Sequence, residues 1–211
     1  MRTKKYFVIS LLALLFSATV VIFWQQEMRY MLPTPVPQDY QPVRPNQPVD
    51  LTGYLERPFD KPILLHFFRA DCPCSRFNID HFRYLAHHYQ DSIDFYVVLP
   101  GEDRPVEVAQ FEERYDMSMP VLIDQYEQLA EACGVYSTPQ AAIITTKGQL
   151  YYRGNYNQAR YCTAKSTSYV ELTIKSLLQG APPPVFVEAA TQSYGCQLPS
   201  QRDNRWFILN L

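Results

Sequence analysis

The chain has 211 residues and a formal net charge of −2 at pH 7, with no long run of either sign. This balance excludes an electrostatic case for nucleic-acid binding, which needs a basic surface. The sequence also lacks a Gly-rich phosphate loop and a dinucleotide fingerprint, so no organic cofactor is expected. Its five cysteines are an odd number, which implies at least one free thiol or a bond to another chain.

An almost unbroken apolar segment covers residues 6–24, close to the ~20 residues that cross a bilayer. Lys4 and Lys5 precede it, so the positive-inside rule predicts that residues 1–5 are cytoplasmic. The alternative is a cleaved signal peptide, although the run is long for one and ends without a small-x-small cleavage site. The sequence therefore favours a single-pass anchor in the inner (cell) membrane, with the remaining chain in the periplasm or an equivalent extracytoplasmic space.

Residues 25–50 hold six prolines and few large apolar side chains, which predicts an extended, semi-rigid linker. The rest of the chain is long enough for one domain with a sizeable core. We expect that domain over residues 51–180, followed by a C-terminal extension over residues 181–211.

The folded part alternates between two kinds of segment. Apolar runs predict strands at residues 61–68, 93–99 and 121–124. Amphipathic or capped segments predict helices at residues 75–89, 107–115, 128–133 and 168–179. Strands at residues 140–145 and 149–153 flank a Thr-Lys-Gly turn, so we expect an antiparallel hairpin. The order predicts an α/β fold with a mixed central sheet flanked by helices and preceded by one transmembrane helix.

The clearest chemical signal is the segment Asp71-Cys72-Pro73-Cys74, which directly follows the first predicted strand. A helix is predicted to begin there. A helix N-terminus stabilises a thiolate through the helix dipole and unpaired backbone N–H groups. The segment therefore predicts thiol–disulfide exchange.

Three segments resemble the thioredoxin-like superfamily over about residues 51–180. The first is the buried strand that runs into Cys72-Pro73-Cys74. The second is Gly134-Val135-Tyr136-Ser137-Thr138-Pro139, which resembles the segment before the superfamily's cis-proline. The third is the hairpin of residues 141–154. More narrowly, the Cys-Pro-Cys motif and the late Tyr-Gly-Cys-x-Leu-Pro resemble an uncharacterised family of membrane-anchored bacterial thioredoxin-like proteins, which brings no established substrate.

This resemblance implies a role for each matched residue. Cys72 is expected to be the nucleophile and Cys74 the resolving thiol. Pro139 is expected to follow a cis peptide bond, leaving the Thr138 backbone to pair with a substrate strand by β-augmentation; the alternative is an ordinary turn proline. The implied function is thiol–disulfide exchange of the oxidoreductase or isomerase type. Its partners would be protein thiols or disulfides in the same compartment, and a membrane redox partner is a further candidate.

The chain departs from the superfamily by having one residue, not two, between the cysteines. A disulfide between Cys72 and Cys74 reaches the required Cα separation only with strain. A strained disulfide is easier to reduce, so this ring favours a disulfide donor or isomerase over a strong reductant. Alternatively the ring forms poorly, and then either Cys74 has another resolving role or Cys72 pairs elsewhere.

His66 occupies the position where thioredoxins hold a buried acid beneath the dithiol. It is either a proton relay to Cys74 or a core histidine bonded to a backbone carbonyl. We expect Cys162 and Cys196 to form a disulfide that holds the C-terminal extension in place, with a second, electron-relaying redox pair as the alternative. Cys133 is expected to be a buried free thiol.

Three other functions remain open. A copper metallochaperone of this fold needs Cys72, Cys74 and a histidine on one metal. However, His81 is expected to point away from the helix start, while His87 and His88 suit a solvated face, so no metal site is expected. A non-catalytic binding module with structural cysteines is the second alternative. A peroxidase is the weakest, because the usual Thr/Pro-rich surroundings of its cysteine are missing.

Overall fold

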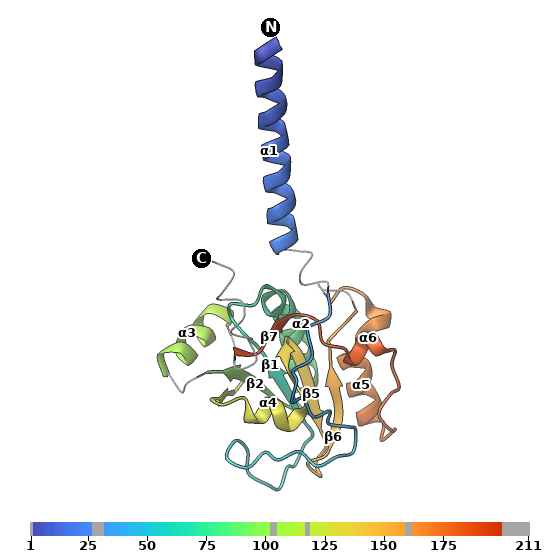
Figure 1. Cartoon of the computed structure of the whole chain (residues 1–211). Helices are drawn as coiled ribbons and strands as arrows, with labels where there is room; N and C mark the ends of the chain where they lie inside the picture. Colours follow the sequence, from blue (N-terminus) through green and yellow to red (C-terminus); the bar gives the residue numbers. More distant parts are fainter. Residues whose placement is uncertain (1, 27–31, 102–104, 117–118, 159–161, 200–211) are drawn as a thin grey trace.

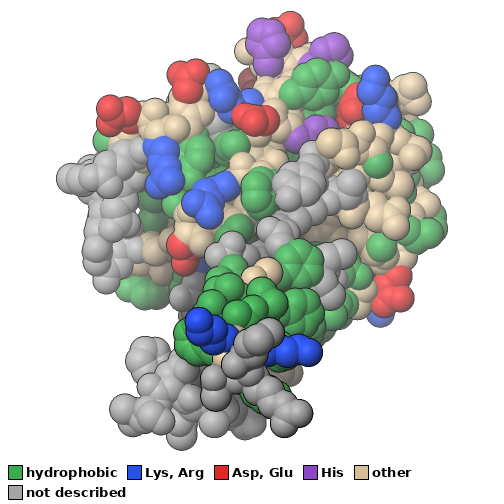
Figure 2. Space-filling view, turned by 90° about the horizontal axis from the view of Figure 1, so that it is seen from above, with side chains coloured by type: hydrophobic (Ala, Val, Ile, Leu, Met, Phe, Trp, Pro, Cys, Tyr) green, Lys and Arg blue, Asp and Glu red, His purple; other side chains and the backbone are tan. Residues whose placement is uncertain are grey.

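The structure is a computed structural model that describes residues 2–26, 32–101, 105–116, 119–158 and 162–199. Helix α1 (Arg2–Gln26) stands apart from an α/β domain (Figure 1). Its segment Lys4–Gln25 is long and apolar enough to cross a membrane. Seen from above, hydrophobic side chains surround the helix and basic side chains lie at its near end (Figure 2). Its large apolar side chains are exposed, so none of them contributes to the domain's core.

Five strands form the central sheet in the order β3-β2-β1-β5-β6. The strands β1 (Ile63–Phe67), β2 (Asp94–Pro100) and β3 (Val121–Asp124) run parallel to one another. The hairpin of β5 (Gln140–Ile144) and β6 (Leu150–Gly154) joins them antiparallel to β1. The sheet is therefore mixed, as predicted.

Helices cover both faces of the sheet. The α-helices of the domain are α2 (Pro73–Tyr89), α3 (Pro105–Tyr115), α4 (Gln128–Cys133), α5 (Tyr169–Leu178) and α6 (Glu188–Thr191). Successive side chains of β1 point to opposite faces, so Leu64 packs with α2 and α5, whereas Leu65 packs with α4. All five residues of β1 are buried, which places the loop after this strand on a rigid support.

Two very short strands form a second sheet at the edge of the domain. Strand β4 (Ser137–Thr138) pairs antiparallel with β7 (Cys196–Gln197) near the end of the described chain. The sequence predicted neither strand, nor α6, nor the 3-10 turn Lys165–Thr167. Residues 200–211 of the predicted C-terminal extension lie outside the described part of the chain.

The predicted linker over residues 25–50 is wrong from residue 32 onward, because this segment lies along the domain. Pro33 forms a β-bridge with Tyr194, and Pro48 forms one with Gln149. Val49 is only 1% exposed. An extended, proline-rich chain suits an edge position because prolines have no N–H group to leave unpaired.

Asp124 fixes the start of α4 and supplies a test of the fold. Its carboxylate is buried and accepts hydrogen bonds from the N–H groups of Leu129 (3.0 Å) and Ala130 (2.8 Å) and from the Tyr54 hydroxyl (2.8 Å). Asp124→Ala should lower the free energy of unfolding by about 3 kcal/mol, because three donors lose a charged partner. Denaturant unfolding of the full chain measures this change.

The matched control is Asp94→Ala. Asp94 is partly exposed and pairs with Lys61 at 3.8 Å. Its loss should change the free energy of unfolding by less than about 1 kcal/mol. Equal losses in the two variants would contradict the capping role of Asp124.

Candidate active site

The candidate site begins at Cys72, the N-cap residue of α2, with Pro73 in the first turn of the helix. The Thr138–Pro139 peptide bond is cis, as the resemblance implies. The Cys72 Sγ atom lies 3.5 Å from the Thr138 carbonyl oxygen. The structure therefore brings Cys72, Thr138 and Pro139 together, although they are far apart in sequence.

Cys72 forms a disulfide with Cys196, with a Cα–Cα distance of 6.0 Å and a sequence separation of 124. The predicted pairing of Cys196 with Cys162 is wrong in this structure, and the ring between Cys72 and Cys74 is not formed. The physical reason is the register of β7 on β4, which places Cys196 opposite Thr138 and therefore beside Cys72. Cys162 lies elsewhere, against α2.

The chain around Cys196 is held mainly through its backbone. The N–H of Leu198 donates to the Tyr136 carbonyl at 3.3 Å. The guanidinium of Arg69 donates to the Gln197 carbonyl at 2.5 Å and also pairs with Asp71. Arg69 is a buried site residue that the sequence analysis missed. Nothing in the sequence distinguishes it from a solvated arginine beside the motif.

Cys74 is a buried thiol in the first turn of α2. Cys162 is also a thiol and is mostly buried; the Asn78 side-chain amide donates to its Sγ at 3.3 Å. Burial raises the pKa of Cys162 to about 12. Cys133 is a fully buried thiol, as predicted, and burial raises its pKa strongly.

His66 lies in the core beneath the motif. Its Nδ1 atom is 2.8 Å from the Tyr156 hydroxyl, and its ring stacks on Phe82 with ring centroids 4.2 Å apart. Complete burial, with a smaller contribution from the charge of His81, lowers the pKa of His66 to about 3. These contacts favour the core histidine over the protonated relay, although its partner is a tyrosine and not a backbone carbonyl.

The lowered pKa of His66 makes stability depend on pH. The unfolded chain takes up a proton on this side chain near pH ~6.5, whereas the folded chain stays neutral down to about pH 3. The unfolded state therefore binds more protons in this window, and His66 lowers the free energy of unfolding by about 1.4 kcal/mol per pH unit as the pH falls.

Unfolding midpoints of the full chain and of His66→Gln, measured between pH 7 and pH 4, test this dependence. The variant should lose the part of the pH slope that belongs to His66. His87→Gln, the same change at an exposed position of α2, is the matched control. A slope unchanged by His66→Gln would show that His66 titrates alike in both states.

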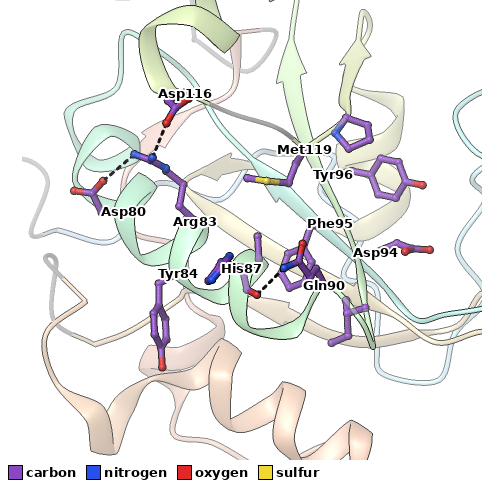
Figure 3. Close-up of a pocket in the computed structure, with 13 residues that line it drawn as sticks. Asp80, Arg83, Tyr84, His87, Gln90, Asp94, Phe95, Tyr96, Asp116 and Met119 are labelled. Carbon is purple, nitrogen blue, oxygen red and sulfur yellow. Dashed lines mark hydrogen bonds and ion pairs between the residues drawn. The ribbon is translucent and has the colours of Figure 1, made fainter.

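Two hollows of the described surface are not lined by the cysteines. A cavity of about 680 Å³ lies along the second half of α2, where Arg83 pairs with both Asp80 and Asp116 (Figure 3). A smaller one of about 350 Å³ lies beside Arg69 and Asp71. Only the smaller hollow borders the motif.

The histidines of α2 do not converge on the disulfide. His81 is partly buried and lies 3.4 Å from the Ser168 hydroxyl. His87 and His88 are exposed, as the solvated-face interpretation predicted. Among the described residues, no group of three or more His, Cys, Asp or Glu side chains has the arrangement of a metal site.

Comparison with known families now places this chain. The model of a family described as a domain of unknown function, DUF6436, matches residues 51–198. The chain belongs to this family. Because the match extends to Leu198, it includes the C-terminal segment that carries Cys196. No curated protein matches the chain.

Solved structures similar to this DUF6436 protein share its fold. An uncharacterised conserved protein from Geobacillus kaustophilus is 21% identical, with a TM-score of 0.61 over 79% of this chain and 97% of that one. A hypothetical protein from Sinorhizobium meliloti is 18% identical, with a TM-score of 0.56 over 65% and 78%. A thioredoxin-like protein in its oxidised form is 16% identical, with a TM-score of 0.47 over 74% and 99%. The mixed five-stranded sheet flanked by helices has the arrangement that the sequence resemblance implied.

Proposed function

We propose that this DUF6436 protein is a membrane-anchored thiol–disulfide exchange protein that acts on protein cysteines through Cys72. The observation that supports the proposal is the position of the disulfide, which joins the N-cap sulfur of α2 to a strand paired beside the cis-proline. A purely structural disulfide needs neither feature.

The helix gives Cys72 the chemistry of an exchange thiol. As the N-cap of α2, its sulfur lies where the helix dipole and unpaired N–H groups stabilise a thiolate. A stabilised thiolate is abundant at neutral pH and is a good leaving group when its disulfide is attacked. We therefore assign Cys72 as the nucleophile and as the sulfur that leaves when the Cys72–Cys196 bond opens.

Two thiols are positioned to resolve a mixed disulfide between Cys72 and a substrate. Cys196 bonds to Cys72 in the structure, so it is the first resolving thiol. Cys74, also in the first turn of α2, is the second and acts when Cys196 is away. Cys72 pairs with a cysteine 124 residues away, so the structure contains no strained Cys72–Cys74 ring that would favour an oxidising enzyme. The direction of exchange follows from the potential of the partner.

The anchor and the compartment complete the proposal. Helix α1 would hold the protein in the inner membrane, with residues 1–5 in the cytoplasm and the domain in an oxidising extracytoplasmic space. A membrane redox partner would then lie within reach of the domain. A cleaved signal peptide is the alternative for this helix, because a signal sequence meets the same criteria of length and apolar composition.

The competing functions fit the site less well. A copper chaperone would need Cys72 as a thiolate, but its sulfur is in a disulfide, and His81 is next to Ser168. A binding module with structural cysteines predicts a disulfide that stays closed under every physiological redox condition. Thiol–disulfide exchange predicts a bond that opens.

Trapping of mixed disulfides tests the proposed function. In full-length Cys74→Ser/Cys196→Ser protein, both resolving thiols are gone, so substrate proteins should stay bonded to Cys72 in living cells. Non-reducing gels should show complexes that disappear on reduction. Adding Cys72→Ser to the same protein should remove them all. Complexes that persist without Cys72 would contradict the assignment of the nucleophile.

A further inference from the structure

Residues 193–198, which we call the tail strand, lie between β4 and the segment around Thr34, and we call the space that they fill the groove. On one side they pair with β4, with Cys196 opposite Thr138. On the other side, the N–H of Thr34 donates to the Ser193 carbonyl at 2.8 Å. With the tail strand in place, Cys72 is 0% exposed. The tail strand therefore occupies an edge of β4 that lies beside the exchange sulfur.

The residue before Cys196 has to be glycine. Gly195 has a φ of +140°, a conformation that other residues rarely adopt. A Cβ atom at this position would also collide with the carbonyl oxygen of Thr138 and lie 3.5 Å from the Pro139 ring. The groove thus excludes side chains directly before the bonded cysteine.

The two residues after Cys196 each make a contact with the domain. Arg69 holds the backbone carbonyl of Gln197, a contact that does not depend on the side chain at this position. Leu198 is 1% exposed and packs in the core cluster that contains Val135 and Leu129. The groove therefore has a closed apolar site for the second residue after the cysteine.

We propose that the tail strand is a tethered copy of the substrate, and that the substrates of this site present cysteine in an extended Gly-Cys-x-Leu segment. The proposal rests on the proposed function and adds the class of substrate to it. An incoming segment and the tail strand need the same edge of β4, so only one can be bound at a time. Return of the tail strand consequently expels the product.

In the reducing direction, the protein passes electrons from a dithiol donor to a substrate disulfide in a series of exchange reactions. A dithiol donor first attacks the partly exposed Cys196 sulfur with its thiolate, and Cys72 leaves as a thiolate. The donor's second thiol then attacks the resulting mixed disulfide, which frees Cys196 and forms the donor disulfide. The Cys72 thiolate then attacks the cysteine of a substrate disulfide, and the other substrate sulfur leaves and takes a proton. Finally the Cys196 thiolate attacks Cys72, the substrate cysteine leaves with the proton from Cys196, and the closed disulfide is restored. Two electrons pass from donor to substrate, and the reverse sequence oxidises a substrate dithiol.

Peptide selectivity tests the proposal. The test uses the full chain carrying two substitutions. Gly195→Ala should displace the tail strand from β4, and Cys196→Ser leaves Cys72 as a thiol. This protein is mixed with peptides of residues 193–199 whose cysteine carries a thionitrobenzoate leaving group, and release of the coloured thiolate gives the rate. The three peptides are the native sequence, one with Gly195→Ala and one with Leu198→Asn. The same protein with Cys72→Ser gives the background.

The native peptide should react with Cys72 about tenfold faster than either altered peptide. The alanine adds a Cβ atom that collides with the Thr138 carbonyl oxygen, and the asparagine loses the apolar packing of Leu198. The single variant Cys196→Ser repeats the comparison in case the double variant does not fold. Equal rates for all three peptides, above the background, would overturn the tethered-copy proposal and leave the exchange function standing. No reaction above the background, with the peptides or with dithiobisnitrobenzoate, would overturn the exchange function itself.

Discussion

Cys72→Ser should abolish the oxidation of the reduced protein by glutathione disulfide, leaving only the uncatalysed background. The reason is chemical: the attacking group is a thiolate, and a serine hydroxyl forms no disulfide. Cys196 would lose its partner as well, so it could form a mixed disulfide with glutathione but no intramolecular bond to position 72. Alkylation at timed intervals, followed by mass spectrometry, measures the rate for each cysteine.

Cys133→Ala is the matched control for this experiment. Cys133 is a fully buried thiol in the core cluster that contains Val135 and Leu129, and its pKa is raised by burial. Its removal should leave the oxidation rate of the remaining cysteines unchanged. A normal rate in Cys72→Ser, or a lost rate in Cys133→Ala, would place the reactive thiol elsewhere.

Gly195→Ala should shift the equilibrium between the closed disulfide and its two thiols about tenfold toward the thiols at a fixed ratio of glutathione to glutathione disulfide. The added Cβ atom meets the Thr138 carbonyl oxygen in the closed form only, so the strain disappears when the tail strand leaves. The measured quantity is the fraction of protein with Cys72 and Cys196 bonded at equilibrium.

Gly180→Ala separates this collision from ordinary backbone strain. Gly180 also has a positive φ, +70°, but a Cβ atom there would meet nothing within 4 Å. This variant should lower stability slightly and leave the disulfide equilibrium unchanged. If both variants shift the equilibrium equally, the effect is global and not a property of the groove.

Local signals explain why most elements were predictable. The strand at residues 121–124 and the helix at residues 128–133 have the predicted bounds. Gly134 ends that helix with a φ of +69°, and its N–H bonds back to the helix carbonyls. Such caps depend on neighbouring residues, so they can be predicted from the sequence without knowledge of the tertiary structure.

The pairing of Cys196 had no such signal. Strands β4 and β7 have two residues each, too few for a period to appear, and the paired residues Thr138 and Cys196 are 58 positions apart in the sequence. The sequence indicated a cis-proline with a free strand edge beside Cys72, and it contained a late Tyr-Gly-Cys segment. It did not indicate that this segment would pair with that strand edge. The packing of residues 32–50 was missed for the same reason, because prolines indicate extension but not its partner.

The most direct test of the account is a redox titration of the full-length protein across a series of glutathione potentials, with alkylation and mass spectrometry to identify each disulfide. We predict that the Cys72–Cys196 bond opens and closes reversibly with a midpoint above roughly −300 mV, the region below which structural disulfides fall. Cys74, Cys133 and Cys162 should remain thiols throughout. A Cys72–Cys196 bond that stays closed at every potential in the series would make it structural and contradict the exchange function.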